Sequence, residues 1–125
     1  MVKVSRAEFE QLVWEAVDTL PSALRDRIAN LEIEVKLKPS PADLADADED
    51  DPNELFGLYR GVPLTERGAH YDMTLPDLIT IFQRPHELAC NSLEELRAEV
   101  RRTVLHELAH HFGISDDRLD ELDAY

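Results

Sequence analysis

The chain has 125 residues, of which 43% are apolar, so its length and composition fit one domain with a single modest core. Its 27 acidic and 13 basic residues give a net charge of -14. This balance argues against nucleic acid and anionic membranes as partners, because both need clustered lysines and arginines. We therefore expect one domain over residues 1–125, with one site and a neutral or cationic partner.

Cysteine usage and the N-terminal segment bear on the cellular compartment. Cys90 is the only cysteine, so no disulfide can form within the chain. Charged residues recur every few positions in the N-terminal segment, where a secretory signal has an apolar core. No apolar run approaches the ~18 residues of a membrane span. These features predict a soluble protein of the cytoplasm.

The N-terminal part predicts two helices and a strand. Apolar residues recur at helical spacing over Ser5–Leu20, and Glu8 lies three residues after Ser5, as in a capping box. A proline follows, and a second, short helix is expected over Ser22–Ile28. Leu31–Leu37 alternates apolar and charged side chains, which is typical of a half-buried strand.

An acidic segment, Ala42–Glu54, has no apolar period and predicts a solvated loop with at most a helical turn at its start. It has a superficial likeness to a calcium-binding loop. Counted from Asp46, however, the sixth position is Asp51 where that loop needs glycine, and the twelfth is Gly57 where it needs glutamate. The pattern therefore does not predict a calcium site.

Two further strands are expected, over Leu55–Gly61 and Asp77–Gln83, because the first run is rich in apolar and aromatic residues and the second in apolar and β-branched residues. Prolines and glycines mark the long connection between them, and a connection of that length in a small domain is usually functional. Pro85 is expected to end the second of these strands. Its central run, Leu78–Phe82, is the leading candidate for an exposed edge that an extended peptide could join.

The longest predicted helix covers Leu93–Phe112. Ser92 and Glu95 form a second capping-box pattern at its start, and Gly113 ends it. Together the predicted elements make an α+β domain in which this helix carries the site. The apolar stripe of the helix consists of Leu93, Val100, Val104, Leu108 and Phe112.

The end of this helix carries a metal-binding pattern. Two histidines four residues apart lie on one side of a helix, so both imidazoles can bind one zinc ion. The glutamate between them can hold a water at the metal, and glycine permits a sharp turn that returns a further ligand. The pattern consists of His106, Glu107, His110, Gly113 and Asp116.

Two imidazoles and one carboxylate leave a fourth zinc position open, which is typical of a catalytic site. His106, His110 and Asp116 are therefore the predicted ligands, and Glu107 is the predicted general base. The competing interpretation is a polar helix surface for the histidines and a helix cap for Asp116. If Asp116 is not the ligand, the substitutes are Asp117, Asp120 and Glu121.

On these residues the chain resembles the small bacterial zincin-like metallopeptidases that carry HExxHxxGxxD near the end of a short domain. The resemblance also covers LFGLYRGVPLTERG and LPDLITIFQRPHELAC. It implies a compact zincin core with a mixed sheet and an active-site helix, and a metal triad at His106, His110 and Asp116. The motif is also similar to that of metzincins, but both methionines lie upstream of it, so the methionine turn of that class is missing.

Other residues have less specific patterns. By helical angle His111 falls on the core side, which predicts a packed histidine, and His70 and His86 are expected to be solvated residues in or beside loops. Cys90 is interpreted as a small buried residue, because no basic neighbour activates its thiol. Trp14 is expected to pack at the edge of the first helix.

The sequence favours a zinc-dependent hydrolase that cleaves peptide bonds with a zinc-activated water and Glu107 as general base. Its expected partner is a peptide or protein substrate, and neither nucleic acid nor a membrane is expected to bind. Two alternatives stay open. One is a metal-dependent RNA-processing hydrolase, whose motif has similar spacing, and the other is a zinc-stabilised binding module without turnover.

Overall fold

The computed structural model describes residues 1–25, 31–61 and 77–113. Predictions that fall on 26–30, 62–76 and 114–125 lie outside the described residues. These include the end of the second predicted helix and most of the long connection between the second and third strands. The individual residues concerned are His70, Asp116, Asp117, Asp120 and Glu121.

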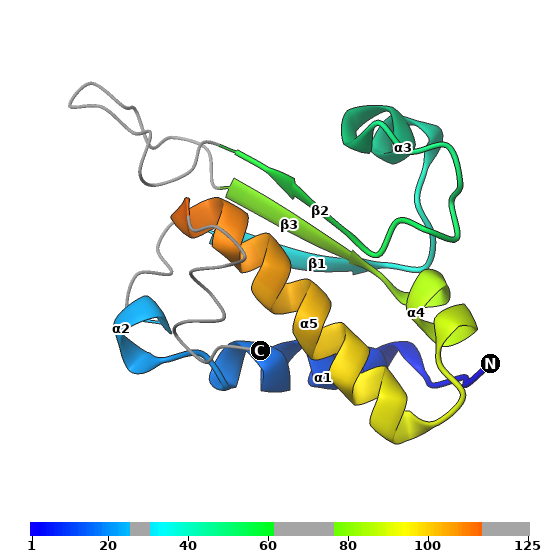
Figure 1. Cartoon of the computed structure of the whole chain (residues 1–125), viewed down its shortest axis with the longest axis horizontal. Coiled ribbons are helices and arrows are strands. Elements are labelled where there is room, and N and C mark those ends of the chain that lie inside the picture. The colour runs from blue at the N-terminus through cyan, green and yellow to red at the C-terminus, as the bar shows by residue number, and fades with distance from the viewer. Residues whose placement is uncertain (26–30, 62–76, 114–125) are drawn as a thin grey trace.

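In the described part of the chain, three strands form one mixed sheet in the order β1, β3, β2 (Figure 1). β1 (Leu31–Lys36) is parallel to β3 (Asp77–Phe82), and β2 (Gly57–Arg60) is antiparallel to it. The α+β class with a small mixed sheet is confirmed. The expectation that Leu78–Phe82 is an exposed edge is wrong, because β3 is paired on both sides. Its apolar run is typical of a strand with both faces covered.

Two long helices cover one face of this sheet: α1 (Arg6–Asp18) and α5 (Leu93–Phe112) (Figure 1). Both were predicted with nearly these bounds. Of the helices that the structure describes, none has the length and hydrophobicity of a membrane span. The residues that form the core between helices and sheet include Phe9, Val13, Ile79, Ile81, Val100, Val104, Leu105 and Leu108.

The helix caps follow the sequence closely. Ser5 and Glu8 form the predicted capping box of α1. Ser92 accepts a hydrogen bond from the Glu95 amide at 3.1 Å, but the Glu95 carboxylate accepts from the Asn91 amide instead of the Ser92 amide. The N-terminus of α5 is therefore capped by a variant of the predicted box. The apolar stripe of α5 is buried from Val100 to Phe112, whereas Leu93 is 48% exposed.

The short helices include α2 (Ser22–Arg25) and one that the sequence did not predict. The acidic segment contains α3 (Pro41–Ala47) instead of a loop with a single turn. Ser40 and Asp43 form a capping box at its start, with proline in the first turn, where its missing N–H is tolerated. Apolar residues on this helix pack against a second small core made of Leu55, Leu58 and Phe82.

A further helix, α4 (Gln83–Ala89), follows β3 directly. Pro85 lies in its first turn, so the proline that was expected only to end a strand also begins a helix. The buried Glu87 carboxylate accepts a hydrogen bond from the Val4 amide at 3.0 Å. This bond ties the N-terminal segment to α4.

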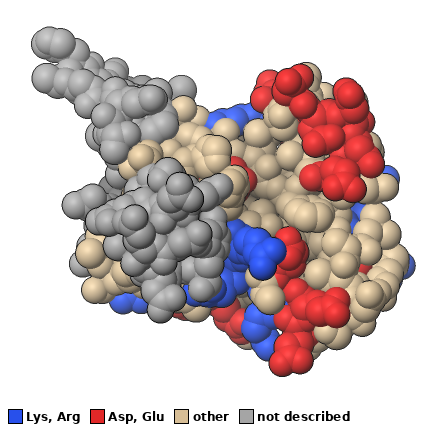
Figure 2. Space-filling model, viewed as in Figure 1, with Lys and Arg blue, Asp and Glu red and all other residues tan. Residues whose placement is uncertain are grey.

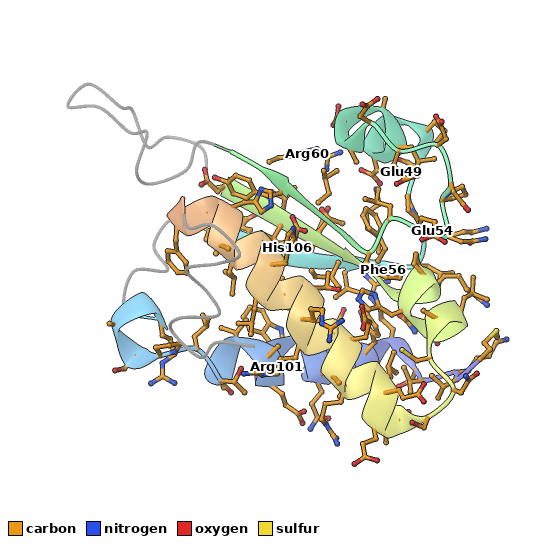
Figure 3. The ribbon with its side chains drawn as sticks, viewed as in Figure 1. Glu49, Glu54, Phe56, Arg60, Arg101 and His106 are labelled. Atoms are coloured by element: carbon orange, nitrogen blue, oxygen red, sulfur yellow. The ribbon has the colours of Figure 1, made fainter. Side chains whose placement is uncertain are left out.

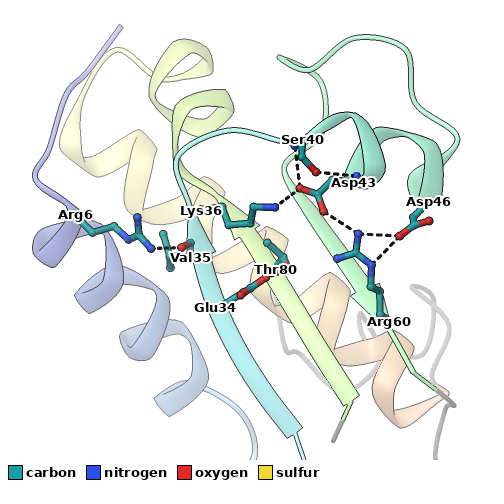
Figure 4. A network of polar contacts seen from close by, with 9 residues as sticks. All are labelled: Arg6, Glu34, Val35, Lys36, Ser40, Asp43, Asp46, Arg60 and Thr80. Carbon is teal, nitrogen blue, oxygen red and sulfur yellow. Dashed lines mark hydrogen bonds and ion pairs between the residues drawn. The ribbon is translucent and has the colours of Figure 1, made fainter. Parts of the chain in front are cut away.

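Asp43 is the centre of a buried polar network that joins α3 to the sheet (Figure 4). Its carboxylate accepts from Lys36 Nζ at 2.5 Å, from Arg60 Nη2 at 2.7 Å and from the Ser40 amide at 2.9 Å. Burial acts to raise the pKa of Asp43, but the hydrogen bonds outweigh it and hold the pKa well below its ordinary value. Asp43 is therefore a charged anchor between α3 and strands β1 and β2.

Candidate metal centre

The last turns of α5 carry the two histidines of the motif. The Nε2 atoms of His106 and His110 lie 3.4 Å apart, and the ring centroids are separated by 5.0 Å. His110 is exposed and His106 is partly exposed. Figure 3 shows His106 on α5 where that helix passes the sheet. The predicted pair of ligands is therefore brought together on one side of the helix.

The separation between the two nitrogens fits a shared zinc ion. Two nitrogens that each lie about 2.0 to 2.1 Å from one tetrahedral ion are separated by about 3.3 to 3.4 Å. In this structure the two nitrogens are 3.4 Å apart. This distance is therefore compatible with one zinc ion between the two imidazoles, and imidazole nitrogen is a common zinc ligand.

Glu107 lies beside this pair and is only 8% exposed. Its side chain runs along β2 at Gly57, where an added Cβ would lie 2.9 Å from Glu107 Cγ and 2.9 Å from Thr103 Cγ2. No real Cβ atom is found at such distances. β2 can therefore approach the Glu107 side chain this closely only because residue 57 is glycine. This role of Gly57 was not predicted from the sequence.

Gly113 ends α5 in the left-handed conformation, with φ of 71°, as the sequence predicted. Its amide bonds back to the His110 carbonyl at 3.2 Å and closes the last turn. The helix therefore ends two residues after His110, at Phe112. Asp116, the predicted third ligand, lies outside the described residues.

Within residues 1–25, 31–61 and 77–113, no three His, Cys, Asp or Glu side chains converge as a metal site. The described part of the candidate centre consists of His106 and His110 with Glu107 beside them. Asp116 lies outside these residues, so its assignment as the third ligand stays a prediction.

Behind the two histidines lies a buried polar cluster that the sequence did not predict. The Asp77 carboxylate, at the start of β3, accepts hydrogen bonds at Oδ2 from the Tyr59 hydroxyl and from His111 Nδ1, both at 2.7 Å. Asp77 is 1% exposed and His111 is fully buried. The packed position of His111 is confirmed, but its partner is polar. Helical spacing indicates on which side His111 lies and contains no signal for a carboxylate 34 residues away.

His86 differs from its prediction. It was expected to be a solvated residue beside a loop, but it lies on α4 and is fully buried. Its Nδ1 lies 2.6 Å from the Phe82 carbonyl oxygen and its Nε2 lies 2.8 Å from the Thr103 hydroxyl. The reason is that α4 starts at once after β3 and turns this side chain towards α5. His86 is therefore a core residue that connects α4 to α5.

Two minor predictions have clear outcomes. Cys90 is buried, as expected, and burial raises the pKa of its thiol, which makes it a poor nucleophile. Trp14 is 53% exposed on α1, so it contributes less packing than the sequence indicated.

A mixed sheet covered on one face by two helices, with paired imidazoles at the end of one helix, defines the zincin class of domain. The chain belongs to the zincin-like metallopeptidase family, because the family model with the description "Zincin-like metallopeptidase" matches residues 28–125. A search of curated proteins gave no match. The match covers the sheet, α5 and the whole HExxHxxGxxD segment.

Proposed function

We propose that the protein is a zinc-dependent peptidase in which His106, His110 and Asp116 hold the metal and Glu107 is the general base. The observation that carries this proposal is the 3.4 Å separation of the two Nε2 atoms beside a largely buried glutamate. Membership of the zincin-like metallopeptidase family supports the same chemistry. A site with three protein ligands leaves one zinc position for water or substrate.

Bound zinc supplies two things to such a reaction: it lowers the pKa of a water ligand to about 7, and it polarises a carbonyl oxygen. The residues of this chain supply proton transfer. The Glu107 carboxylate takes the proton of the attacking water and later delivers it to the nitrogen of the leaving amine. Gly57 keeps β2 close to this carboxylate and restricts where it can point.

Among the strands that the structure describes, β2 lies at one edge of the sheet, and the side of β2 away from β3 is the proposed binding place for an extended peptide substrate. The Phe82 amide donates to the Phe56 carbonyl at 2.9 Å, so Phe56 faces β3. Backbone groups alternate along a strand, so those of Gly57 face away from β3. A peptide that pairs with this edge would pass Glu107, which contacts Gly57. The peptide is thus proposed to pair with β2 and not, as the sequence indicated, with β3, because β3 is the central strand.

The first test compares metal binding with peptide hydrolysis. We expect one zinc ion per chain, lost when either His106 or His110 is changed to alanine. Glu107→Gln should keep zinc within a few-fold of the wild-type affinity and lose at least about a hundredfold in hydrolysis of a mixed peptide library, since general acid–base catalysis is worth about 10² to 10⁴ in rate. Metal analysis and the library assay, each with and without chelator, give both readouts.

Two results would contradict this proposal. Strong loss of zinc in Glu107→Gln would make the glutamate a ligand instead of a base. Tight zinc binding by the wild type without hydrolysis of any library member would favour the zinc-stabilised binding module. Asp116→Asn completes the set, because it should weaken zinc binding, whereas Asp117→Asn and Asp120→Asn should not.

A further inference from the structure

The buried cluster of Tyr59, Asp77 and His111 joins three elements, β2, β3 and α5. The candidate metal centre depends on the position of α5 relative to the two strands. Asp77 begins β3, Tyr59 lies on β2, and His111 lies in the last turn of α5. One carboxylate oxygen, Asp77 Oδ2, accepts from both partners at 2.7 Å. Such a buried Asp–His pair is costly to desolvate and is weak evidence for stability by itself. A role in holding β2, β3 and α5 in place relative to one another explains why the pair is buried here.

The cluster lies next to the second histidine of the motif. His111 follows His110 in sequence, and the Tyr59 ring centroid is 6.0 Å from that of His110 and 6.3 Å from that of His111. Consecutive residues of a helix point about 100° apart. A bond that holds His111 towards the strands therefore sets the direction in which His110 points, away from the core.

The last turn of a helix needs such a restraint. Carbonyl groups at a helix end lack partners within the helix, and terminal turns open more easily than central ones. His110 is in this position, because α5 ends at Phe112 and Gly113 is its C-cap. His106 lies one turn further inside the helix and is less exposed to this opening.

We propose that Asp77 is a positioning residue, whose buried carboxylate fixes His110 opposite His106 by bonding Tyr59 and His111. Asp77 does not touch the metal or the substrate in this role. The proposal rests on the proposed function, since it assumes that His106 and His110 bind zinc. What it adds to that function is that zinc affinity depends on a carboxylate outside the HExxHxxGxxD motif.

The experiment compares Asp77→Ala with Asp43→Ala. Both carboxylates are buried, with 1% and 2% exposure, and both bridge separate elements, but Asp43 bonds α3 to β1 and β2 instead of to α5. Zinc affinity is measured by competition with a chromophoric chelator, and the ligand geometry is read from the visible spectrum of the cobalt(II)-substituted protein. Urea unfolding of the metal-free proteins records the loss of stability.

We expect both variants to lose stability, and only Asp77→Ala to change the metal site. Its zinc affinity should fall by at least about tenfold, in the range seen when groups that orient metal ligands are removed. Its cobalt spectrum should also differ from that of the wild type. A purely structural role of Asp77 would move the urea midpoint alone, as in Asp43→Ala.

A graded series guards against a variant that fails to fold. Tyr59→Phe removes the hydrogen bond from the Tyr59 hydroxyl to Asp77 but leaves that from His111, so it should weaken zinc binding less than Asp77→Ala. His111→Asn places an amide N–H near the position of Nδ1 and should keep most of the affinity, whereas His111→Leu should not. Cobalt spectra are recorded for all three.

The outcomes separate the two proposals. If the wild type binds neither zinc nor cobalt, the proposed function fails and this inference fails with it. If the wild type binds zinc but Asp77→Ala and His111→Leu bind as tightly with unchanged cobalt spectra, only the positioning role of Asp77 is wrong.

Discussion

His86 is an imidazole held inside the core without charge. The rings of Phe9 and Phe56 flank it, with centroid distances of 5.5 and 4.9 Å, and Figure 3 marks Phe56 close to α4. Burial lowers the pKa of His86 from 6.5 to about 4, although its bond to the Phe82 carbonyl acts in the opposite direction. The folded state therefore resists protonation at a pH where an unfolded chain accepts a proton.

Mild acid should destabilise the fold through this residue. The contribution of His86 to stability is fully present above pH 6.5 and is lost as the pH falls towards 4, because the unfolded state binds more protons in this window. The full loss is about 3 kcal/mol, at ~1.36 kcal/mol per pKa unit. Urea unfolding of the metal-free protein at several values between about pH 7 and pH 4 measures it.

His86→Gln is the matched variant, because glutamine is polar and does not titrate. It should be less stable than the wild type at neutral pH, since the Thr103 hydroxyl and the Phe82 carbonyl lose a well-placed partner. Its stability should also fall less steeply with acid. An equal slope for both proteins would show that the acid sensitivity arises elsewhere.

Residue types alone could not distinguish the roles of the histidines that lie outside the motif. His106 and His110 were predicted as zinc ligands because two histidines four residues apart on a helix can bind one metal ion. His86 and His111 have no such spacing relative to their partners, and a core position of an imidazole depends on packing that brings distant elements together. Their hydrogen bonds to Thr103 and Asp77 span 17 and 34 residues.

At the level of elements, the contact between β2 and α5 restricts the position of Glu107, the proposed general base. Gly57→Ala would place a Cβ 2.9 Å from Glu107 Cγ and Thr103 Cγ2, so the strand or the glutamate has to move. We expect about 1 to 3 kcal/mol of destabilisation from overpacking. Peptide hydrolysis should fall tenfold or more, since small displacements of catalytic groups cost about this much or more.

Zinc affinity separates this effect from general unfolding. Gly57→Ala should bind zinc nearly as the wild type does, because the three atoms nearest to the added methyl group belong to Glu107 and Thr103. Its kinetic behaviour should approach that of Glu107→Gln. Wild-type turnover in a folded Gly57→Ala protein would show that the glutamate tolerates displacement, and would weaken its assignment as the base.

The predicted and missed elements differ in the strength of their local signals. α1 and α5 have long apolar periods and side-chain caps, and both were predicted almost to the residue. α3 and α4 have seven residues each, too few for a period to be recognised. Their start signals were present, as a capping box at Ser40 and a proline in the first turn of α4. The order of strands depends on long-range pairing, which is why β3 was mistaken for an edge.

At the scale of the whole molecule, negative charge is unevenly spread. Figure 2 shows acidic side chains gathered over α3 and the loop that follows it. Exposed residues of this surface are Asp46, Asp48, Asp50, Asp51 and Glu54. A field of this sign attracts cationic segments of a substrate and repels phosphate backbones.

We expect no appreciable binding of structured RNA near physiological salt, because a chain with net charge -14 has few cations to exchange for counterions. Fluorescence anisotropy with a labelled hairpin RNA, read across a series of salt concentrations, measures this. Micromolar binding that weakens steeply with salt would favour the RNA-processing hydrolase over the peptidase.

The place of β3 in the sheet also has a consequence for the order of folding. β1 and β2 precede β3 in the chain, yet each of them pairs with β3 and they do not pair with one another. During synthesis neither strand has its sheet partner until Asp77–Phe82 has left the ribosome, and such long-range pairing is slow to form. α5 packs on β2 and β3, so the histidine pair can acquire its geometry only after this central strand has been inserted. We therefore expect the proposed metal centre to be among the last parts of the molecule to form, so that zinc binding would report completion of the fold.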